Sequence, residues 1–324
     1  MSDIDRVLRS NLKLKHLQLV VALDQFRHLG RAAEFLSLTQ PAVSKSLVEI
    51  ERMFGLPLFV RSTRGTEPTA YGEKVARFAR SVLADYARTR EDIAAIGSGG
   101  AGHIRVGAMV VATPSLVAPA VARLKAESPR CVVSIEEGDL SRLLPRLRVA
   151  ELDFIVGRLE PGYAAPDLET EALYTESMAV VVAPDHALAS VRQPAWALLA
   201  QHPWVVPPAW ASSRIKLDQM FYKHRLDPPG DIIESASFLM TLTFLQQRHC
   251  VAFVASEVAR HLAQQGLAVT LPVAVPIELP PVGLLRLRTG LRTPAGDRLL
   301  DLLRQVAAER VPHAAAKRSR RRLA

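Results

Sequence analysis

The chain has 324 residues, of which 49% are hydrophobic and 23% charged, a composition typical of folded globular domains rather than disordered or fibrous chains. This length suffices for two or three domains that each bury a core. The opening MSDIDRVLRS lacks the apolar stretch of a signal peptide, and no apolar run reaches the roughly 18 residues of a membrane span, so we expect a cytoplasmic protein with no membrane partner.

The net charge of +9 is concentrated at the two ends of the chain. Residues 1–64 hold ten Lys and Arg against six Asp and Glu, the tail 317–324 holds five basic residues and no acidic one, and residues 65–316 are neutral overall. A basic N-terminal module favours binding to a polyanion. The tail is too short and polar to pack, so we expect a solvated end that adds at most nonspecific phosphate contacts.

Only two cysteines occur, and each begins an apolar segment typical of a buried strand: CVVSI at Cys131 and CVAFV at Cys250. We expect both to be reduced thiols inside a core. A redox-sensing pair is the alternative, although nothing in the local sequence would lower a thiol pKa.

Three helical patterns open the chain. In 13–26, apolar residues recur at helical spacing until Asp24 interrupts them. A short second helix is expected over 30–38, where Ala32 and Ala33 are small enough to let another helix cross closely. Helix, short Ala-rich helix, tight turn and a third helix make up the helix-turn-helix arrangement.

The third helix, within LTQPAVSKSLVEIERMFG (38–55), contains a proline that is tolerated only in a first turn. We therefore expect Thr39 to cap the helix, Pro41 to lie in its first turn and Gly55 to end it. Its apolar stripe is Val43, Leu47, Ile50 and Phe54, and its other face carries Gln40, Ser44, Lys45, Val48 and Arg52. Polar donors at the N-terminal end of a helix are typical of base reading in the major groove, and equally typical of a solvated first turn.

The segment 56–72 begins with an apolar extended stretch and continues through Arg61 and Arg64 into a turn-prone loop, which suits a basic hairpin beside the helices. A long helix follows over 73–97. Its apolar residues lie near heptad spacing, and a small N-terminal domain could not cover them all, so we expect the helix to pack on a copy of itself.

GSGGAG (97–102) formally matches a dinucleotide-binding motif, but a helix precedes it and a strand follows it, so we interpret it as a flexible linker. From 103 onward strands and helices alternate, which predicts parallel, doubly wound sheets. Proline clusters at 161–166 and 272–281 suit two lobes joined by two crossover segments. Strands are expected at 103–110, 131–137, 153–158, 177–183, 203–206, 231–235, 250–254, 268–272 and 282–288, and helices near 114–127, 140–150, 213–224, 238–248, 256–265 and 294–310.

The N-terminal residues resemble the winged helix-turn-helix of LysR-type transcriptional regulators. The matching features are the Ala32-Ala33 pair, the run Thr39-Gln40-Pro41-Ala42-Val43-Ser44, the acidic pattern before Phe54-Gly55, the entry Pro57-Leu58-Phe59, and Arg64-Gly65 followed by Thr69 and Gly72. The later order of long helix and two lobes is similar to the family's effector-binding region, so the resemblance covers nearly the whole chain. TAYGE and LGRAA further resemble the subgroup that includes regulators of aromatic-acid and sugar catabolism.

The resemblance implies an α/β protein of four parts: a winged helix-turn-helix over 1–72, a linker and dimerisation helix over 73–97, an effector-binding domain over 98–312 and a basic tail over 313–324. The effector-binding domain would be periplasmic-binding-protein-like, with one lobe of about 103–160 plus 276–310 and a second of about 168–270. Contacts to bases and phosphates are implied for Thr39, Gln40, Pro41, Ser44 and Lys45, and contacts to the DNA backbone for Arg31, Arg61 and Arg64. Gly30 falls at the position where many members cap the second helix with Ser or Thr.

A small effector is implied between the lobes, held by hydroxyl groups and helix N-termini, which favour anions. Arg158 could pair with a carboxylate. The candidates are Val110, Val111, Thr113, Ser115, Asp139, Arg158, Ser212, Ser213, Ser237 and Phe238, although each of the polar ones could equally be a helix cap or a surface residue. The apolar members favour an effector with a hydrophobic body, such as an aromatic or other small carboxylate.

We therefore expect a transcriptional regulator that binds double-stranded DNA at an interrupted palindrome as a homodimer or homotetramer. Effector binding would change lobe closure, and with it DNA bending or contact with RNA polymerase. No motif of a hydrolase, a P-loop or a zinc site occurs, so we expect no enzyme, cofactor or metal. A two-lobed solute-binding protein without a regulatory role is the alternative, but it would not need residues 1–97.

Overall fold

The computed structural model describes residues 12–62, 65–98, 102–290 and 292–321. The chain divides into two compact units, one of Met1–His103 with Pro145–Leu152 and the other of Ile104–Leu144 with Asp153–Ala324. Among the described residues, none of the helices combines the length and apolarity that crossing a bilayer would demand.

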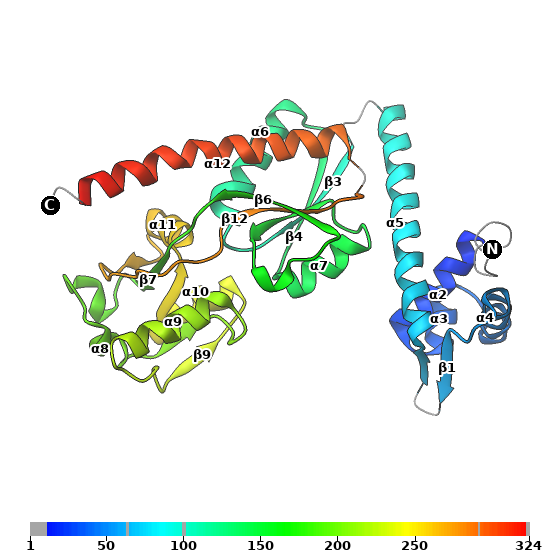
Figure 1. The fold of residues 1–324 in the computed structure, drawn as a ribbon, viewed down its shortest axis with the longest axis horizontal. Coiled ribbons are helices and arrows are strands. Elements are labelled where there is room, and N and C mark those ends of the chain that lie inside the picture. Colours follow the sequence, from blue (N-terminus) through cyan, green and yellow to red (C-terminus); the bar gives the residue numbers. More distant parts are fainter. Residues whose placement is uncertain (1–11, 63–64, 99–101, 291, 322–324) are drawn as a thin grey trace. The chain divides into compact units, whose positions relative to one another are not determined.

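The first unit contains the predicted helix-turn-helix and the predicted hairpin (Figure 1). Its two strands pair antiparallel, with Phe59 opposite Pro68 and Ser62 opposite Gly65, and we call this hairpin the wing. The three helices of the sequence interpretation are confirmed to within a few residues at each end. In chain order the elements are α2 (Leu14–Phe26), α3 (Leu29–Phe35), α4 (Gln40–Phe54), β1 (Phe59–Ser62), β2 (Gly65–Pro68) and α5 (Ala70–Ser98).

The cap of α3 differs from the expectation. Gly30 was expected at the cap position, but the N-cap is His28, whose Nδ1 accepts hydrogen bonds from the main-chain N–H groups of Gly30 (3.1 Å) and Arg31 (3.4 Å). A ring nitrogen two and three residues before these free N–H groups satisfies them as a Ser hydroxyl would. The expectation was wrong because glycine has no side chain with which to accept these bonds.

One apolar core holds the first unit together. The stripe of α4 is buried as predicted, with Val43, Leu47 and Ile50 fully inaccessible to solvent. Helix α5 contributes Ala76 and Ala79 to this core, so the N-terminal domain covers more of the long helix than expected. Other apolar residues of α5 remain exposed: Phe78, Tyr86 and Ile93.

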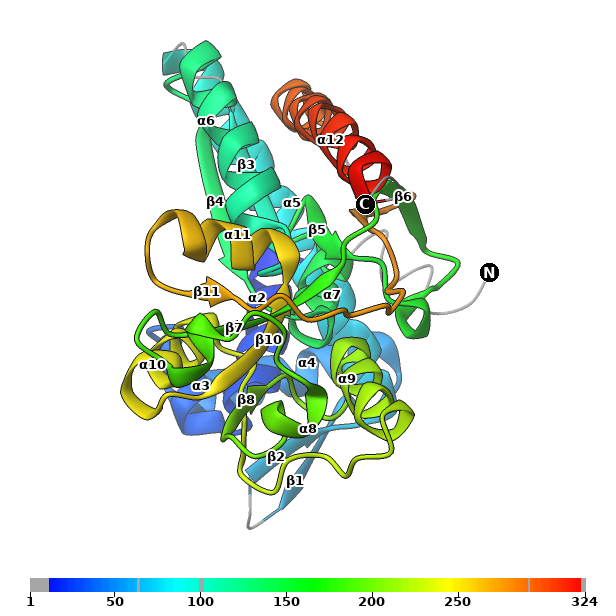
Figure 2. The same cartoon turned by 90° about the vertical axis from the view of Figure 1, so that its left-hand side faces the viewer.

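The second unit contains two five-stranded sheets, with strand orders β4-β3-β5-β12-β6 and β11-β7-β10-β8-β9. Figure 2 shows β7, β10 and β8 of the second sheet side by side. The first sheet consists of β3 (His103–Ala108), β4 (Val132–Glu137), β5 (Phe154–Arg158), β6 (Leu168–Tyr174) and β12 (Val282–Leu287). The second consists of β7 (Met178–Val182), β8 (Trp204–Val206), β9 (Ile232–Glu234), β10 (Val251–Ala255) and β11 (Val269–Thr270).

Both sheets are mixed, which corrects the expectation of parallel sheets. Strands β3 and β5 pair parallel, as do β8 with β9 and with β10, but β12 is antiparallel to β5 and β6, and β7 is antiparallel to β10 and β11. The antiparallel strands β7 and β12 are those that directly follow a passage from one sheet to the other, with no helix in between. A strand that arrives without a helical crossover is free to run in the opposite direction.

Strand β6 was not predicted. Its residues fall in the range expected for the second lobe, yet it pairs with β12 at the edge of the first sheet, so the sheet of the second lobe begins with β7. The sequence LETEALY carries Glu169 and Glu171, which mask a strand pattern. These glutamates form bidentate ion pairs with Arg286 of β12 and with Arg304.

The helices after α5 follow the predicted order, except that the short helix α8 (Trp196–Leu199) was not predicted. A π-helical turn, η1 (Thr113–Val117), precedes the first helix, and the last helix continues to Arg321, eleven residues beyond its predicted end. Pro145 lies inside a helix, where it cannot donate a main-chain hydrogen bond. The α-helices are α6 (Ala118–Glu127), α7 (Leu140–Arg148), α8 (Trp196–Leu199), α9 (Ser212–Lys223), α10 (Phe238–Arg248), α11 (Ser256–Gln264) and α12 (Pro294–Arg321), and two 3-10 turns are η2 (Pro161–Tyr163) and η3 (Ala187–Ser190).

Candidate DNA-binding interface and effector region

The first turn of α4 has the cap and the proline position that the sequence predicts. The Thr39 hydroxyl accepts a hydrogen bond from the main-chain N–H of Ala42 at 3.4 Å, and Pro41 lies in the first turn, where its missing N–H costs nothing. Gly55 adopts the left-handed conformation that ends the helix. Thr39, Gln40, Pro41 and Lys45 are exposed, so the described part of the chain leaves the N-terminal end of α4 open to solvent.

The wing brings a basic residue to this helix. Arg61 of β1 is exposed, and its Nη1 donates a hydrogen bond to Ser44 Oγ of α4 at 3.0 Å. Two residues predicted for DNA binding from separate elements therefore lie together. Arg31 is exposed on α3. Arg64 lies outside the described residues.

Glu51, on the partly buried side of α4, holds the wing in place. Its Oε1 accepts from the main-chain N–H groups of Leu58 (2.8 Å) and Phe59 (3.0 Å), where the chain enters β1. In the sequence, Glu51 stands out only as part of the acidic pattern before Phe54-Gly55. A carboxylate directly after the buried Ile50 and three residues before the buried Phe54 was the available signal.

Asp24 is the second residue whose role sequence reasoning missed. Its side chain is 9% exposed and pairs with Arg80 of α5 and with Arg27 Nη2, the latter at 2.9 Å. The interruption of the apolar run of α2 therefore reflects an ion pair at the packed interface between α2 and α5. The signal was present as a misplaced carboxylate, but its partner 56 residues away was not visible in the pattern.

On the first-sheet side of the effector region, Val111 is buried and Val110 is half-buried. Thr113 Oγ1 donates to the carbonyl of Met109 at 3.3 Å. Ser115 Oγ lies in η1, is inaccessible to solvent and has no hydrogen-bond partner among the described residues. A π-helical turn with an unsatisfied hydroxyl is typical of functional positions.

Two further candidates serve as helix caps. Asp139 Oδ1 accepts from the main-chain N–H groups of Ser141 (2.8 Å) and Arg142 (3.3 Å) at the start of α7. Ser237 Oγ accepts from the N–H of Met240 at 3.3 Å, at the start of α10, next to the half-buried Phe238. Their polar atoms are engaged with the backbone, as expected for residues that precede helices.

A hydrogen bond connects the segment after β5 with α9. Ser212 Oγ donates to Glu160 Oε1 at 2.7 Å, and the half-buried Ser213 follows it in the first turn of the helix. Glu160 lies two residues after β5, whereas Ser212 follows the second sheet's β8. The contact therefore joins segments that leave different sheets.

Arg158, at the end of β5, is buried and hydrogen-bonded within the protein rather than exposed as a cation available to a ligand. Its residue is 5% exposed, and Nη1 donates to the carbonyl of Pro280 in the second crossover at 2.9 Å. Burial lowers the pKa of Arg158, while the carboxylates of Glu160 and Glu176 oppose the shift. Because the guanidinium is buried and already donates to the Pro280 carbonyl, the geometry does not support pairing with an effector carboxylate.

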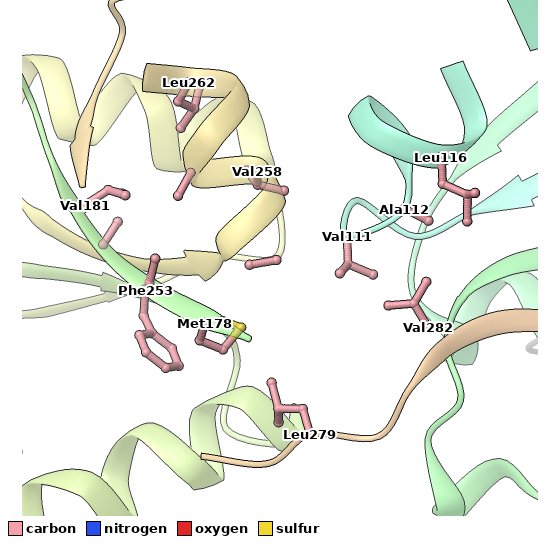
Figure 3. Close-up of a cluster of buried hydrophobic side chains, with 14 of the residues drawn as sticks. Val111, Ala112, Leu116, Met178, Val181, Phe253, Val258, Leu262, Leu279 and Val282 are labelled. Carbon is pink, nitrogen blue, oxygen red and sulfur yellow. The ribbon is translucent and has the colours of Figure 1, made fainter. Parts of the chain in front are cut away.

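The two sheets share a single apolar cluster. Figure 3 shows Val111, Ala112 and Leu116 on one side, Met178 and neighbouring side chains of the second sheet on the other, and Leu279 on a segment that runs between them. Of the candidate effector residues, Val111 belongs to this cluster and Phe238 packs against it.

The cysteines lie in this cluster, as predicted. Cys131 and Cys250 are unpaired and fully buried, and burial raises the pKa of both thiols. A raised pKa disfavours the thiolate that redox chemistry requires.

Comparison with known proteins agrees with this arrangement. Residues 14–73 match the bacterial regulatory helix-turn-helix protein of the lysR family, and residues 97–308 match the LysR substrate binding domain. The HTH-type transcriptional regulator GbpR of Azospirillum brasilense is 30% identical over 92% of this chain and 87% of its own length. The regulator GalR of Pseudomonas putida is also 30% identical, over 91% of this chain and 74% of its own length.

Two solved structures share the fold. Full-length CbnR in complex with its target DNA superposes with a TM-score of 0.67 at 16% identity, covering 91% of this chain and all of that one. A full-length single-residue variant of OxyR from Pseudomonas aeruginosa superposes with a TM-score of 0.60 at 25% identity, covering 91% of this chain and 98% of that one. With a helix-turn-helix and a two-sheet substrate-binding region both matched, the chain belongs to the LysR family of DNA-binding, effector-responsive transcriptional regulators, which are not enzymes.

Proposed function

We propose that this regulator acts as a dimer or tetramer in which two copies of α4 enter successive major grooves of an interrupted palindrome. A small effector bound between the two sheets of the second unit then changes DNA bending or the contact with RNA polymerase. The observation that carries the DNA half of this proposal is the placement of Arg61 against Ser44, beside the exposed, capped end of α4.

The proposed roles follow from exposure and chemistry. Gln40 is an exposed amide in the first turn and suits bidentate reading of adenine. Lys45 and Arg31 are exposed cations suited to contacts with DNA phosphates. Arg61 is exposed on the wing, from which it would contact the DNA backbone. We also assign contacts with the DNA backbone to Thr39, Pro41 and Ser44. Arg64 is assigned the same role from its position in the sequence alone.

For the effector we propose hydroxyl groups as the main polar contacts. Ser115 has an unsatisfied hydroxyl on one side, and Ser212 and Ser213 open α9 on the other. Val110, Val111 and Phe238 supply apolar surface, while Thr113 begins η1 and Ser237 caps α10. Because Arg158 is engaged with Pro280, the helix N-termini carry the preference for an aromatic or other small carboxylate.

The DNA-binding proposal is tested with a duplex that the wild-type protein selects from a random library. Gln40→Ala should weaken binding to this duplex by roughly 1–3 kcal/mol and change binding to random duplexes little, because one base contact is lost. Lys45→Ala should weaken both and reduce the magnitude of the salt slope by about one. Affinities are measured by fluorescence anisotropy across a salt series.

Gln246→Ala on α10 and Lys223→Ala on α9 are matched controls, since both residues are exposed on the second unit. Equal losses on selected and random duplexes for Gln40→Ala would argue against base reading. An unchanged salt slope would remove Lys45 from the interface.

A further inference from the structure

Arg27 adopts a backbone conformation that is unusual for its residue type. It follows the last residue of α2 with φ of 51°, in the left-handed region that glycine adopts most easily. Its N–H donates to the carbonyl of Leu23 at 3.0 Å and so ends the helix. Glycine would end α2 with less strain, which indicates that the arginine side chain has a role of its own.

Both the backbone and the side chain of Arg27 contact the wing. The carbonyl of Arg27 accepts from the main-chain N–H of Thr66 at 2.8 Å, and Nη1 forms an ion pair with Glu67 Oε2 at 2.8 Å. The strand lies so close that a Cβ on Gly65 would come within 2.6 Å of the Arg27 carbonyl oxygen. Arg27 thus holds the outer edge of β2.

The guanidinium of Arg27 also contacts α2, through Asp24. Nε donates to the carbonyl of Asp24 at 2.6 Å, and Nη2 pairs with Asp24 Oδ1 at 2.9 Å. Asp24 in turn pairs with Arg80 of α5. The orientation of Arg27 is therefore set by both α2 and the long helix.

The position held by Arg27 lies across the hairpin from the DNA-facing arginine. Thr66 pairs with Arg61 and Glu67 pairs with Val60 in the register of the wing. Arg61 reaches Ser44 of α4 from the opposite strand, at 3.0 Å. A shift of β2 relative to α2 would carry Arg61 away from α4.

We propose that Arg27 is a positioning residue for DNA binding: it fixes the wing against α2 so that Arg61 lies beside Ser44. The inference rests on the proposed roles of α4 and the wing. Because Arg27 and Glu67 have side-chain exposures of 42% and 65%, their ion pair adds little to folding stability. Its contribution is to the geometry of the DNA-binding surface.

Arg27→Gly separates positioning from stability. Glycine relieves the left-handed backbone but also removes one of the two cationic partners of Asp24, which keeps Arg80, so the Tm should change little. The affinity for the selected duplex should fall about fivefold as the wing loses its side-chain anchor. Arg225→Gly is the matched control, because Arg225 is an exposed arginine of the second unit with φ of 58°. The control relieves the same backbone conformation and should leave the DNA affinity unchanged.

Glu67→Gln distinguishes positioning from direct phosphate contact. Removing a negative charge from the wing should strengthen DNA binding if charge alone matters. The proposal predicts a loss of about threefold instead, because the exposed ion pair that positions β2 is gone. In the Arg27→Gly background the same change should have no further effect, because its partner is absent.

The proposal is overturned if Arg27→Gly lowers the Tm and the DNA affinity follows the folded fraction, or if Glu67→Gln tightens binding. It is also overturned if Arg27→Gly binds the selected duplex normally. In that case a loss with Gln40→Ala and with Arg61→Ala would leave the proposed function intact, so the two failures are distinguishable.

Discussion

Single polar residues of this protein satisfy the backbone before they are available to a ligand. Each helix start leaves several N–H groups without partners, so a Ser, Thr, Asp or His at that place accepts from them first. Asp139 and Ser237 were predicted as effector contacts and act as caps. Ser115 differs, since its buried hydroxyl has no partner among the described residues, which makes it the stronger effector candidate.

His186 shows the same principle in a titratable group. It is 5% exposed, and its Nδ1 accepts from the main-chain N–H of Leu188 at 2.9 Å. The rings of His202 and His249 lie near it, at centroid distances of 5.0 and 6.2 Å, and Asp185 faces the same cluster. The pKa of His186 is lowered below its ordinary value of 6.5. Burial is the larger cause, and the charge of His202 is the second.

This lowered pKa predicts a loss of stability in mild acid. As pH falls below 6.5 the unfolded chain takes up a proton that the folded chain refuses, so the stabilisation is complete above 6.5 and is lost as pH falls toward the folded pKa. His186→Asn keeps an acceptor for Leu188 but does not titrate. Urea unfolding at about pH 7.5 and about pH 5.5, on either side of the ordinary histidine pKa, should show a smaller decrease for this variant than for wild type.

His16 of α2 is also buried with a lowered pKa, so both proteins should keep part of the pH dependence. An equal decrease in the two proteins would show that His186 does not contribute.

At the scale of elements, α5 has two faces with different partners. Ala76 and Ala79 pack on the core of the N-terminal domain, whereas Phe78, Tyr86 and Ile93 remain 43%, 53% and 65% exposed. Exposed apolar residues near heptad spacing are typical of a helix that packs on a second copy. Members of the LysR family form oligomers, and this face is the surface that we assign to that contact.

Phe78→Asp combined with Ile93→Asp should therefore weaken the oligomer by roughly tenfold or more, the size of a hot-spot loss, since two charges enter an apolar seam. Light scattering after size exclusion measures the change. Arg77→Asp is the control, because Arg77 lies about 100° around the helix from Phe78. An unchanged oligomer in the double variant would place the subunit contact elsewhere.

The strands of the two sheets show which features a sequence pattern predicts and which it does not. Apolar strands such as β5 and β7 were located correctly because their residues are buried along the whole strand and nearly all are hydrophobic or small. β6 was missed, since its glutamates find arginine partners from β12 and α12 that lie 117 and 133 residues away. Strand direction was predicted wrongly because periodicity contains no information about it.

At the scale of the second unit, the two sheets share one apolar cluster and are bridged by Ser212 and Glu160. An effector that binds here has to replace or extend this bridge, and so would change how the two sheets close.

Replacing both Ser212 and Ser213 by Ala should weaken effector binding while leaving DNA affinity intact, because two hydroxyls at the start of α9 are lost. Thermal shifts of the full chain with a panel of aromatic carboxylates and sugars measure the response. Ser128→Ala with Ser190→Ala removes two hydroxyls elsewhere and serves as control. A normal shift in the α9 variant would move the effector site away from Ser212 and Ser213.

The sequence by itself determined the helix-turn-helix, the wing and the order of most later elements, β6 and α8 excepted. Those features depend on caps, prolines and apolar spacing within a few residues of one another. Tertiary structure alone decided strand direction, the internal pairing of Arg158, and the contact of Arg27 with Glu67, 40 residues away. Such contacts join residues distant in sequence, and only the folded backbone determines which polar groups meet.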